Sequence, residues 1–157
     1  MLNKIRIVLV ETSHAGNIGA AARAMLSMGI SRLYLVNPKT PITEKSYALA
    51  THADDIISNA LVVANLPEAL EGVDFVVGTS ARERRFSLPL VSAEQACHTG
   101  LNHCLGDGAE MAIVFGRERT GLYNEELLMC HVHSFIPTCS TFAARHGERN
   151  ARSSRPG

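Results

Sequence analysis

The fold of this chain is decided near its start, by the sequence IRIVLV at residues 5–10 and by the turn and helix predicted directly after it. The run is almost continuously apolar and rich in β-branched residues, which is typical of a strand buried on both faces of a parallel sheet. A polar turn over residues 11–17 leads into a helix predicted for residues 18–28, which Gly29 ends. A second short strand is predicted at residues 33–36. A strand, a helix and a strand in this order form the unit from which parallel α/β sheets are built.

The same alternation continues along the chain. Further strands are predicted at residues 61–63, 75–77, 112–115 and 134–136, and further helices at residues 44–52, 66–71, 92–104 and 124–130. The pattern predicts an α/β fold with a mostly parallel sheet flanked by helices. We expect one domain over residues 1–138 and a basic, disordered tail over residues 139–157.

Composition excludes several classes of protein. The chain has 157 residues, of which 46% are hydrophobic and 19% charged, as expected of a globular protein with one core. No apolar run reaches the roughly 18 residues that a membrane span needs. The first residues lack the apolar stretch of a signal peptide, and the four cysteines are too scattered for a disulfide scaffold. We therefore expect a cytoplasmic protein with no membrane partner.

The charges are unevenly distributed. The formal net charge is zero, but the last 19 residues carry four arginines and one acid, so the rest of the chain is acidic. Six arginines of this acidic part lie in three short segments, at residues 23, 82–85 and 117–119. Each segment lies in or just beyond the connection that follows a predicted strand, and the carboxyl ends of parallel strands meet at one edge of a sheet. The sequence predicts a local positive patch there, which suits phosphate ligands.

The first of these segments is GNIGAAAR at residues 16–23. Asn17 is predicted to cap the helix N-terminus, and the missing side chain of Gly19 would let a ligand approach it. Arg23, one turn further along, is placed to bind a phosphate. A capped helix with a solvated arginine is the alternative interpretation.

Two further segments come after buried strands. In GTSARERR at residues 78–85, small hydroxyl residues at a strand end can hold a polar ligand through the main chain. In FGRERTGL at residues 115–122, two glycines bracket charged residues, so the backbone must turn tightly or lie against a ligand. Glu118 is predicted to orient a neighbouring arginine or to accept a hydrogen bond from a substrate. Ordinary surface loops are the alternative for both segments.

Other chemistries match the sequence less well. A dinucleotide-binding dehydrogenase needs G-x-G-x-x-G and an acid after the second strand, but the chain has G-x-x-G and Asn37. Ser80 lacks the G-x-S-x-G context of an acyl-transfer nucleophile. The His/Cys pairs at residues 97–98, 103–104 and 130–133 lack the spacing of closed zinc sites, so no metal is predicted.

Together these segments resemble the SpoU branch of the SPOUT methyltransferases, which transfer a methyl group to a ribose 2′-hydroxyl of RNA. The family's first motif, N-x-G-x-x-x-R, is matched by Asn17, Gly19 and Arg23, and its second, F-G-x-E-x-x-G-L, by residues 115–122. The opening residues 5–17, with VGTSAR and GRER further on, are most similar to members that methylate nucleotide 32 of the tRNA anticodon loop. The resemblance extends to about residue 137.

The resemblance implies a homodimer that binds tRNA and holds S-adenosyl-L-methionine in a deep trefoil knot, a rare exception to the unknotted rule. It implies three catalytic residues: Asn17, Arg23 and Glu118. It implies cofactor contacts, mostly through backbone, from Thr79, Ser80, Ala81, Gly116, Gly121 and Ile136. It implies RNA contacts from Arg82, Arg84 and Arg117. Because an arginine is a poor base, Arg23 is expected to stabilise the developing alkoxide or to orient a phosphate.

The sequence departs from the family after Ile136. There the family continues into a third motif with a Ser-x-Asn core and a long apolar helix that completes the knot, whereas this chain reads CSTFAARHGERNARSSRPG. We therefore expect an incomplete methyltransferase domain with impaired activity. A non-catalytic RNA-binding remnant of the same family is the alternative.

Overall fold

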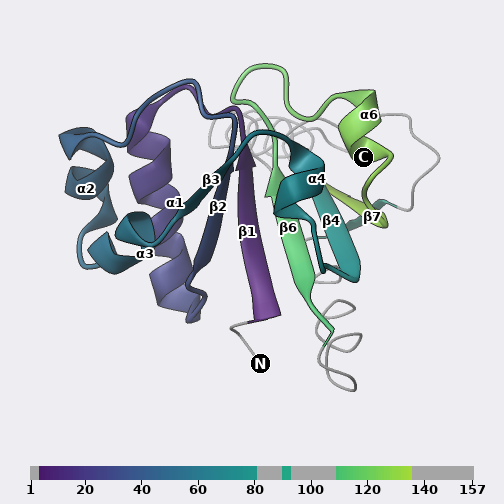
Figure 1. Ribbon diagram of the computed structural model, residues 1–157, viewed down its shortest axis with the longest axis horizontal. Helices are drawn as coiled ribbons and strands as arrows, with labels where there is room; N and C mark the ends of the chain where they lie inside the picture. The colour runs from purple at the N-terminus through teal and green to yellow at the C-terminus, as the bar shows by residue number, and fades with distance from the viewer. Residues whose placement is uncertain (1–3, 81–89, 93–108, 136–157) are drawn as a thin grey trace, which may run out of the picture.

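The computed structural model describes residues 4–80, 90–92 and 109–135, which form one parallel sheet with helices on both faces (Figure 1). The strands are β1 (Ile5–Val10), β2 (Arg32–Val36), β3 (Leu61–Val63), β4 (Phe75–Ser80), β5 (Leu90–Ser92), β6 (Met111–Phe115) and β7 (Val132–Phe135). The helices are α1 (Ala15–Met28), α2 (Glu44–Ala50), α3 (Asp54–Ser58), α4 (Leu66–Ala69) and α6 (Asn124–Leu127). The predicted α/β fold is confirmed.

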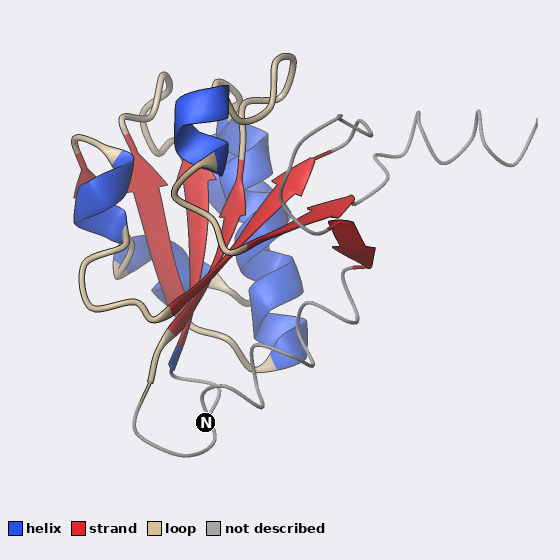
Figure 2. Ribbon diagram, turned by 90° about the vertical axis from the view of Figure 1, so that its right-hand side faces the viewer, coloured by secondary structure: helices blue, strands red, loops and turns tan. Residues whose placement is uncertain are grey.

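The seven described strands lie in the order β3-β2-β1-β6-β4-β7-β5, and every pairing is parallel. Figure 2 shows how the sheet twists from strand to strand. Parallel pairing places the carboxyl ends of all seven strands at the same edge. We call this the carboxyl edge, and the opposite one the amino edge.

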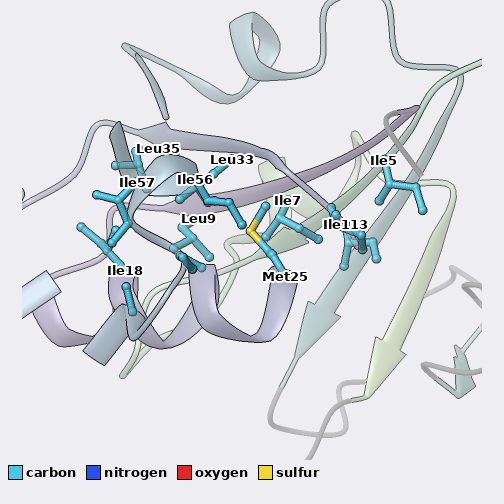
Figure 3. Packing of buried hydrophobic residues seen from close by; sticks show 14 of the residues in the cluster. Ile5, Ile7, Leu9, Ile18, Met25, Leu33, Leu35, Ile56, Ile57 and Ile113 are labelled. Atoms are coloured by element: carbon cyan, nitrogen blue, oxygen red, sulfur yellow. The ribbon is translucent and has the colours of Figure 1, made fainter. Parts of the chain in front are cut away.

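Alternate residues of the strands enter two separate cores. On one face, Ile7 and Leu9 of β1 and Ile113 of β6 pack with Ile18 and Met25 of α1 (Figure 3). On the other face, neighbouring strand residues pack instead under α4 and α6. All six residues of β1 are buried, as the run IRIVLV predicts for a strand covered on both faces.

The connections diverge between β1 and β6. The chain leaves β1 toward α1 on one face and leaves β6 toward α6 on the other, although the two strands are neighbours. In open α/β sheets such a switch point opens a crevice outside the carboxyl ends of the strands, where ligands bind. The fold therefore brings the first and second family motifs to the place where a site is expected.

Several predicted boundaries are wrong by a few residues. Helix α1 begins at Ala15, so His14 is the N-cap and Asn17, predicted as the cap, lies inside the first turn. Strand β4 runs to Ser80 and does not end at residue 77. The sequence did not predict α3 or β5, and the predicted helix at residues 92–104 lies almost wholly outside the described residues. None of the described helices is long and apolar enough to cross a membrane.

Candidate functional site

The centre of the candidate site is the Glu118 carboxylate, which joins the loop after β6 to the loop after β1. It accepts hydrogen bonds from the Thr12 hydroxyl, from the backbone N–H of Ser13 at 3.1 and 3.2 Å, and from the Ser13 hydroxyl at 2.9 Å. The Asn17 side-chain amide donates a further bond at 3.0 Å. The two family motifs are therefore in direct contact, across 101 residues of sequence.

These bonds decide the charge of Glu118. Its partial burial raises the pKa, but the hydrogen bonds from Thr12, Asn17 and Ser13 favour the charged form more strongly and lower the pKa to about 2. Glu118 is therefore an anion at neutral pH. Because a carboxylate only accepts, the Asn17 amide turns its NH2 group toward Glu118 and keeps its Oδ1 as an acceptor for another group.

Arg117, the neighbour of Glu118, lies in a second cluster. Its guanidinium pairs with Glu11 after β1 and with Glu126 of α6 at 2.8 Å, and it lies 3.7 Å from the ring centroid of Tyr123. Burial opposes the charged form of Arg117, but the hydrogen bonds that it donates to the two carboxylates outweigh this effect and raise its pKa. Its side chain is only 12% exposed. This geometry argues against the predicted RNA contact, and it shows that the acids orienting Arg117 are Glu11 and Glu126, not Glu118.

The two glycines of the second motif shape the loop between them. Arg117 and Gly121 pair through both backbone hydrogen bonds, at 2.9 and 3.1 Å, and Gly121 has a φ of 68°. A Cβ at Gly116 would lie 2.2 Å from the Gly121 carbonyl carbon. Of the two interpretations that the sequence left open for this loop, the tight turn is confirmed. Whether either glycine also contacts a cofactor stays a prediction.

Gly19 is buried and serves helix packing. A Cβ there would lie 1.9 Å from the carbonyl oxygen of Ser46, so the missing side chain lets α1 approach α2. Because Gly19 faces another helix, its position argues against the prediction that it opens the helix N-terminus to a ligand.

Arg23, by contrast, is exposed, and none of the residues that the structure describes pairs with its guanidinium. Arg119, at the tip of the loop after β6, is exposed in the same way. The carboxyl edge and its neighbourhood therefore present at least two arginines that an anionic ligand can reach.

The carboxyl ends of β4 and β7 supply two buried hydroxyls. Thr79 donates a 2.9 Å hydrogen bond to the carbonyl of Val114, so its side chain ties β4 to β6. Ser134, the partner of Thr79 in β7, is fully buried, and its Oγ has no hydrogen-bond partner within the described part of the chain. Ser80 ends β4. The predicted site residues Ala81, Arg82, Arg84 and Ile136 lie outside the described residues.

An open groove of about 630 Å³ lies beside this site. It is lined by residues 13–16, where the chain enters α1, by Thr40, and by residues 43–45 at the start of α2. His14 and Lys45 are its basic residues, and Glu44 is its acid. The groove shares Ser13 with the hydrogen-bond cluster of Glu118.

The described His and Cys residues of the 130–133 segment have structural neighbours. Cys130 is buried against Gly78, and burial raises the pKa of its thiol to about 12. The His131 ring accepts a hydrogen bond from the backbone of Val76 and stacks on Phe75. Over residues 4–80, 90–92 and 109–135, no three His, Cys, Asp or Glu side chains gather to hold a metal ion.

Sequence reasoning missed the partners that hold the two motif residues: Thr12 and Ser13 around Glu118, and Glu11, Tyr123 and Glu126 around Arg117. The sequence did hold one signal for Glu11, Thr12 and Ser13, since these residues come directly after a buried strand and so belong to the carboxyl edge. Glu126 lies in the first turn of a helix, where acids are common for local reasons, so nothing in its position indicates the ion pair.

Comparison with known proteins places these features in one family. Residues 4–144 match the SpoU rRNA Methylase family. The tRNA (cytidine/uridine-2′-O-)-methyltransferase TrmJ of Pectobacterium atrosepticum is 50% identical over 145 residues, which are 87% of this chain and 56% of that protein. The chain thus spans about half the length of the curated relatives it matches.

Solved structures of similar proteins have the same fold as this chain. A probable methyltransferase from Bordetella pertussis superposes with a TM-score of 0.81 at 33% identity, covering 87% of this chain and 83% of that one. A probable methylase family protein from Haemophilus influenzae gives a TM-score of 0.79 at 47% identity, covering 89% and 58%. The SpoU methyltransferase AviRb from Streptomyces viridochromogenes, solved in complex with the cofactor AdoMet, shares the fold at 18% identity, with a TM-score of 0.59, covering 85% and 48%.

Proposed function

Because the chain belongs to the SpoU rRNA Methylase family, we propose that it is an S-adenosyl-L-methionine-dependent methyltransferase domain that acts on a ribose 2′-hydroxyl of tRNA. The observation that carries the proposal is the hydrogen bond between Asn17 and Glu118, which unites the two family motifs at the carboxyl edge. The 50% identity to TrmJ of Pectobacterium atrosepticum favours tRNA as the substrate, and we propose nucleotide 32 of the anticodon loop as the target.

The reaction places two requirements on the protein. The ribose oxygen gains a methyl group that bound S-adenosyl-L-methionine would supply, and the hydroxyl gives its proton to solvent water as its oxygen becomes an ether. Such a transfer depends on orientation and on stabilising the charge that develops on the oxygen.

We assign orientation to Asn17 and Glu118. Glu118, fixed as an anion by four neighbouring donor groups, holds the Asn17 amide in one orientation, so that Oδ1 can accept a hydrogen bond from the ribose hydroxyl. With a pKa of about 2, Glu118 is a poor proton acceptor at neutral pH, so we propose it as a positioning residue. Arg23, whose charge is not neutralised by a described partner, is free to bind an RNA phosphate or the developing alkoxide.

The residues at the ends of β4 and β7 fit a polar cofactor. Ser134 Oγ is a buried hydroxyl without a partner among the described residues, and a buried polar atom of this kind costs stability unless a ligand or water satisfies it. We propose that the cofactor lies at this edge, near Thr79, Ser80, Ala81, Gly116, Gly121 and Ile136. Arg82 and Arg84 remain proposed RNA contacts, and a homodimer remains the proposed assembly.

The test is methyl transfer from labelled S-adenosyl-L-methionine to an unmodified tRNA transcript. We expect label in the tRNA, and none when nucleotide 32 carries a 2′-deoxyribose. Label that persists on the deoxy transcript would contradict ribose methylation at that position. If the protein binds tRNA but binds no S-adenosylhomocysteine, the non-catalytic alternative holds. A rate far below that of a full-length relative would support the predicted impairment.

A further inference from the structure

Arg117 and Arg119 lie two residues apart in the same loop, but their surroundings are opposite. Arg119 is exposed, and no described residue pairs with it. Arg117 is enclosed by two carboxylates, a backbone carbonyl and an aromatic ring. A positive charge that is already neutralised gains little from a phosphate, because binding would have to break existing bonds. The two arginines must therefore serve different purposes.

The guanidinium of Arg117 uses both of its terminal nitrogens. Nη1 donates to Glu126 Oε1 at 2.8 Å and to the Gly121 carbonyl at 3.2 Å, while Nη2 donates to Glu126 Oε2 at 3.1 Å and to Glu11. The pair with Glu126 is bidentate, which adds geometric specificity to the attraction. The hydrogen bond from Arg117 is also the main cause that lowers the pKa of Glu11. These bonds are present throughout the neutral pH range.

The cluster joins three parts of the molecule. Glu11 is the first residue of the β1–α1 loop, Gly121 closes the loop after β6, and Glu126 belongs to α6. Glu126 also accepts a hydrogen bond from the backbone N–H of Tyr123 at 2.6 Å, so the same carboxylate that binds Arg117 holds the start of α6. One side chain thus sets the relative position of both loops and a helix.

The consequence reaches the proposed site through adjacent residues. Arg117 holds Glu11, and its neighbour Glu118 holds Thr12 and Ser13, which come directly after Glu11. A shift of the Arg117 side chain and of the loop that carries it would move the Glu118 carboxylate relative to the Asn17 amide. Displacements of about 1 Å at such contacts can cost about 100-fold in rate.

We propose that Arg117 is a positioning residue, which fixes the loop carrying Glu118 against the loop leading to Asn17, and that it does not contact RNA. The catalytic part of this inference rests on the proposed function. It differs from the sequence-based expectation, in which Arg117 contacts RNA, and the two assignments predict opposite results for several substitutions.

The first test is the conservative variant Arg117→Lys, with Arg119→Ala and Arg119→Lys as matched variants two residues away. Lys retains the charge that a phosphate contact needs but cannot reproduce the bidentate, stacked geometry. We expect Arg117→Lys to lower kcat for methyl transfer about 10- to 100-fold, without changing the salt dependence of tRNA binding.

Removing one phosphate contact reduces the slope of log K against log[salt] by about 0.7–0.9. We expect that reduction in Arg119→Ala and its recovery in Arg119→Lys. Full activity of Arg117→Lys would overturn the proposal.

The second test removes a partner and leaves Arg117 in place. Glu126→Gln frees part of the guanidinium, so a direct RNA contact would predict tighter tRNA binding. The positioning role predicts no gain in affinity and a fall in kcat in the same direction as Arg117→Lys. The kcat of the double variant should be no lower than that of the worse single variant, because both substitutions disrupt one cluster. A gain in affinity for Glu126→Gln would overturn the proposal.

A third measurement is independent of catalysis. Hydrogen exchange in the free protein should rise at residues 11–17 in Arg117→Lys but not in Arg119→Ala, provided that thermal melting shows both variants folded at the temperature used. Unchanged exchange at residues 11–17 in Arg117→Lys would overturn the positioning role. If the unmodified protein neither binds tRNA nor transfers methyl groups, the proposed function fails, and this exchange experiment alone decides the role of Arg117.

Discussion

The amino and carboxyl edges of the sheet both hold a cluster of arginine, carboxylate and tyrosine, but the ratio of arginines to carboxylates is reversed between them. At the amino edge one carboxylate, Glu110, lies between two arginines. Arg6 pairs with it at 2.6 Å and lies 5.0 Å from the ring centroid of Tyr34, and Arg32 pairs with its other oxygen. Arg6 also donates to the carbonyl of Ala69 at 3.0 Å, so this cluster joins three neighbouring strands and α4.

At the carboxyl edge one arginine lies between two carboxylates. Arg117 pairs with Glu11 and Glu126 and stacks on Tyr123, and the residues that it joins belong to loops and to a helix start. The amino-edge cluster instead connects residues within strands or next to them.

Similar chemistry can therefore serve either stability or function, depending on what it joins. At the amino edge the cluster joins strands whose register the apolar cores already determine, so its loss should affect stability more than function. At the carboxyl edge it holds loops made mostly of polar residues, so its loss should change the site before it unfolds the domain. Substitutions at the two edges can separate these effects.

The largest expected effect is on stability, from Glu110→Gln. This change leaves the buried Arg6 charge without its carboxylate, and breaking such a pair costs about 3 kcal/mol. For a domain of this size we expect the melting temperature to fall by about 6–12 °C. The rate of methyl transfer per folded molecule should stay unchanged. Glu71→Gln, at an exposed acid near the same edge, is the control and should melt like the unmodified protein.

Glu118→Gln should show the reverse. A glutamine offers one carbonyl oxygen where the carboxylate accepts from several donors, and its NH2 group opposes that of Asn17. We expect kcat to fall about 100-fold, with a smaller fall in melting temperature than in Glu110→Gln. The control is Glu125→Gln, an exposed acid of α6. If Glu118→Gln melted much earlier and remained active, the two edges would not differ as described.

Gly19→Ala tests whether the glycine of the first motif serves packing or ligand binding. Its Cβ would meet backbone of α2 at 1.9 Å, which cannot yield as a flexible side chain can, and overpacking of this kind costs about 1–3 kcal/mol. Gly16→Ala is the matched variant, because its nearest neighbour is the end of the Leu49 side chain. We expect a lower melting temperature for Gly19→Ala only. Normal melting with lost S-adenosylhomocysteine binding would instead favour a ligand role for Gly19.

The smallest effect is the pH dependence of stability. The pKa values of Glu11, Glu110 and Glu118 are lowered in the folded protein, so these groups stabilise it above their ordinary pKa of 4.5. That contribution is lost as the pH falls from about 4.5 through the lower folded-state values. Urea midpoints should therefore be level above about pH 5.5 and decline below pH 4.5. The decline should be shallower in Glu118→Gln, and parallel profiles would contradict the assigned role of its carboxylate.

Much of the fold could be predicted, since an apolar run such as residues 5–10 is an intrinsic property of the sequence. The roles of adjacent charged residues could not. Arg117 and Glu118 both come after Gly116, and only the tertiary structure shows that one joins Glu11 and Glu126 while the other joins Thr12, Ser13 and Asn17. The N-cap prediction also failed, since α1 begins two residues before Asn17, at Ala15, and the Asn17 amide bonds Glu118 from a distant part of the chain.

Hydrogen exchange measured with saturating S-adenosylhomocysteine and tRNA compares the two edges in a single experiment. We expect slower exchange at the carboxyl edge, at residues 11–17 and 116–121, and no change at the amino edge, at residues 30–32 and 109–111. Protection at the amino edge, or none at the carboxyl edge under conditions where both ligands are bound, would contradict a site at the carboxyl edge.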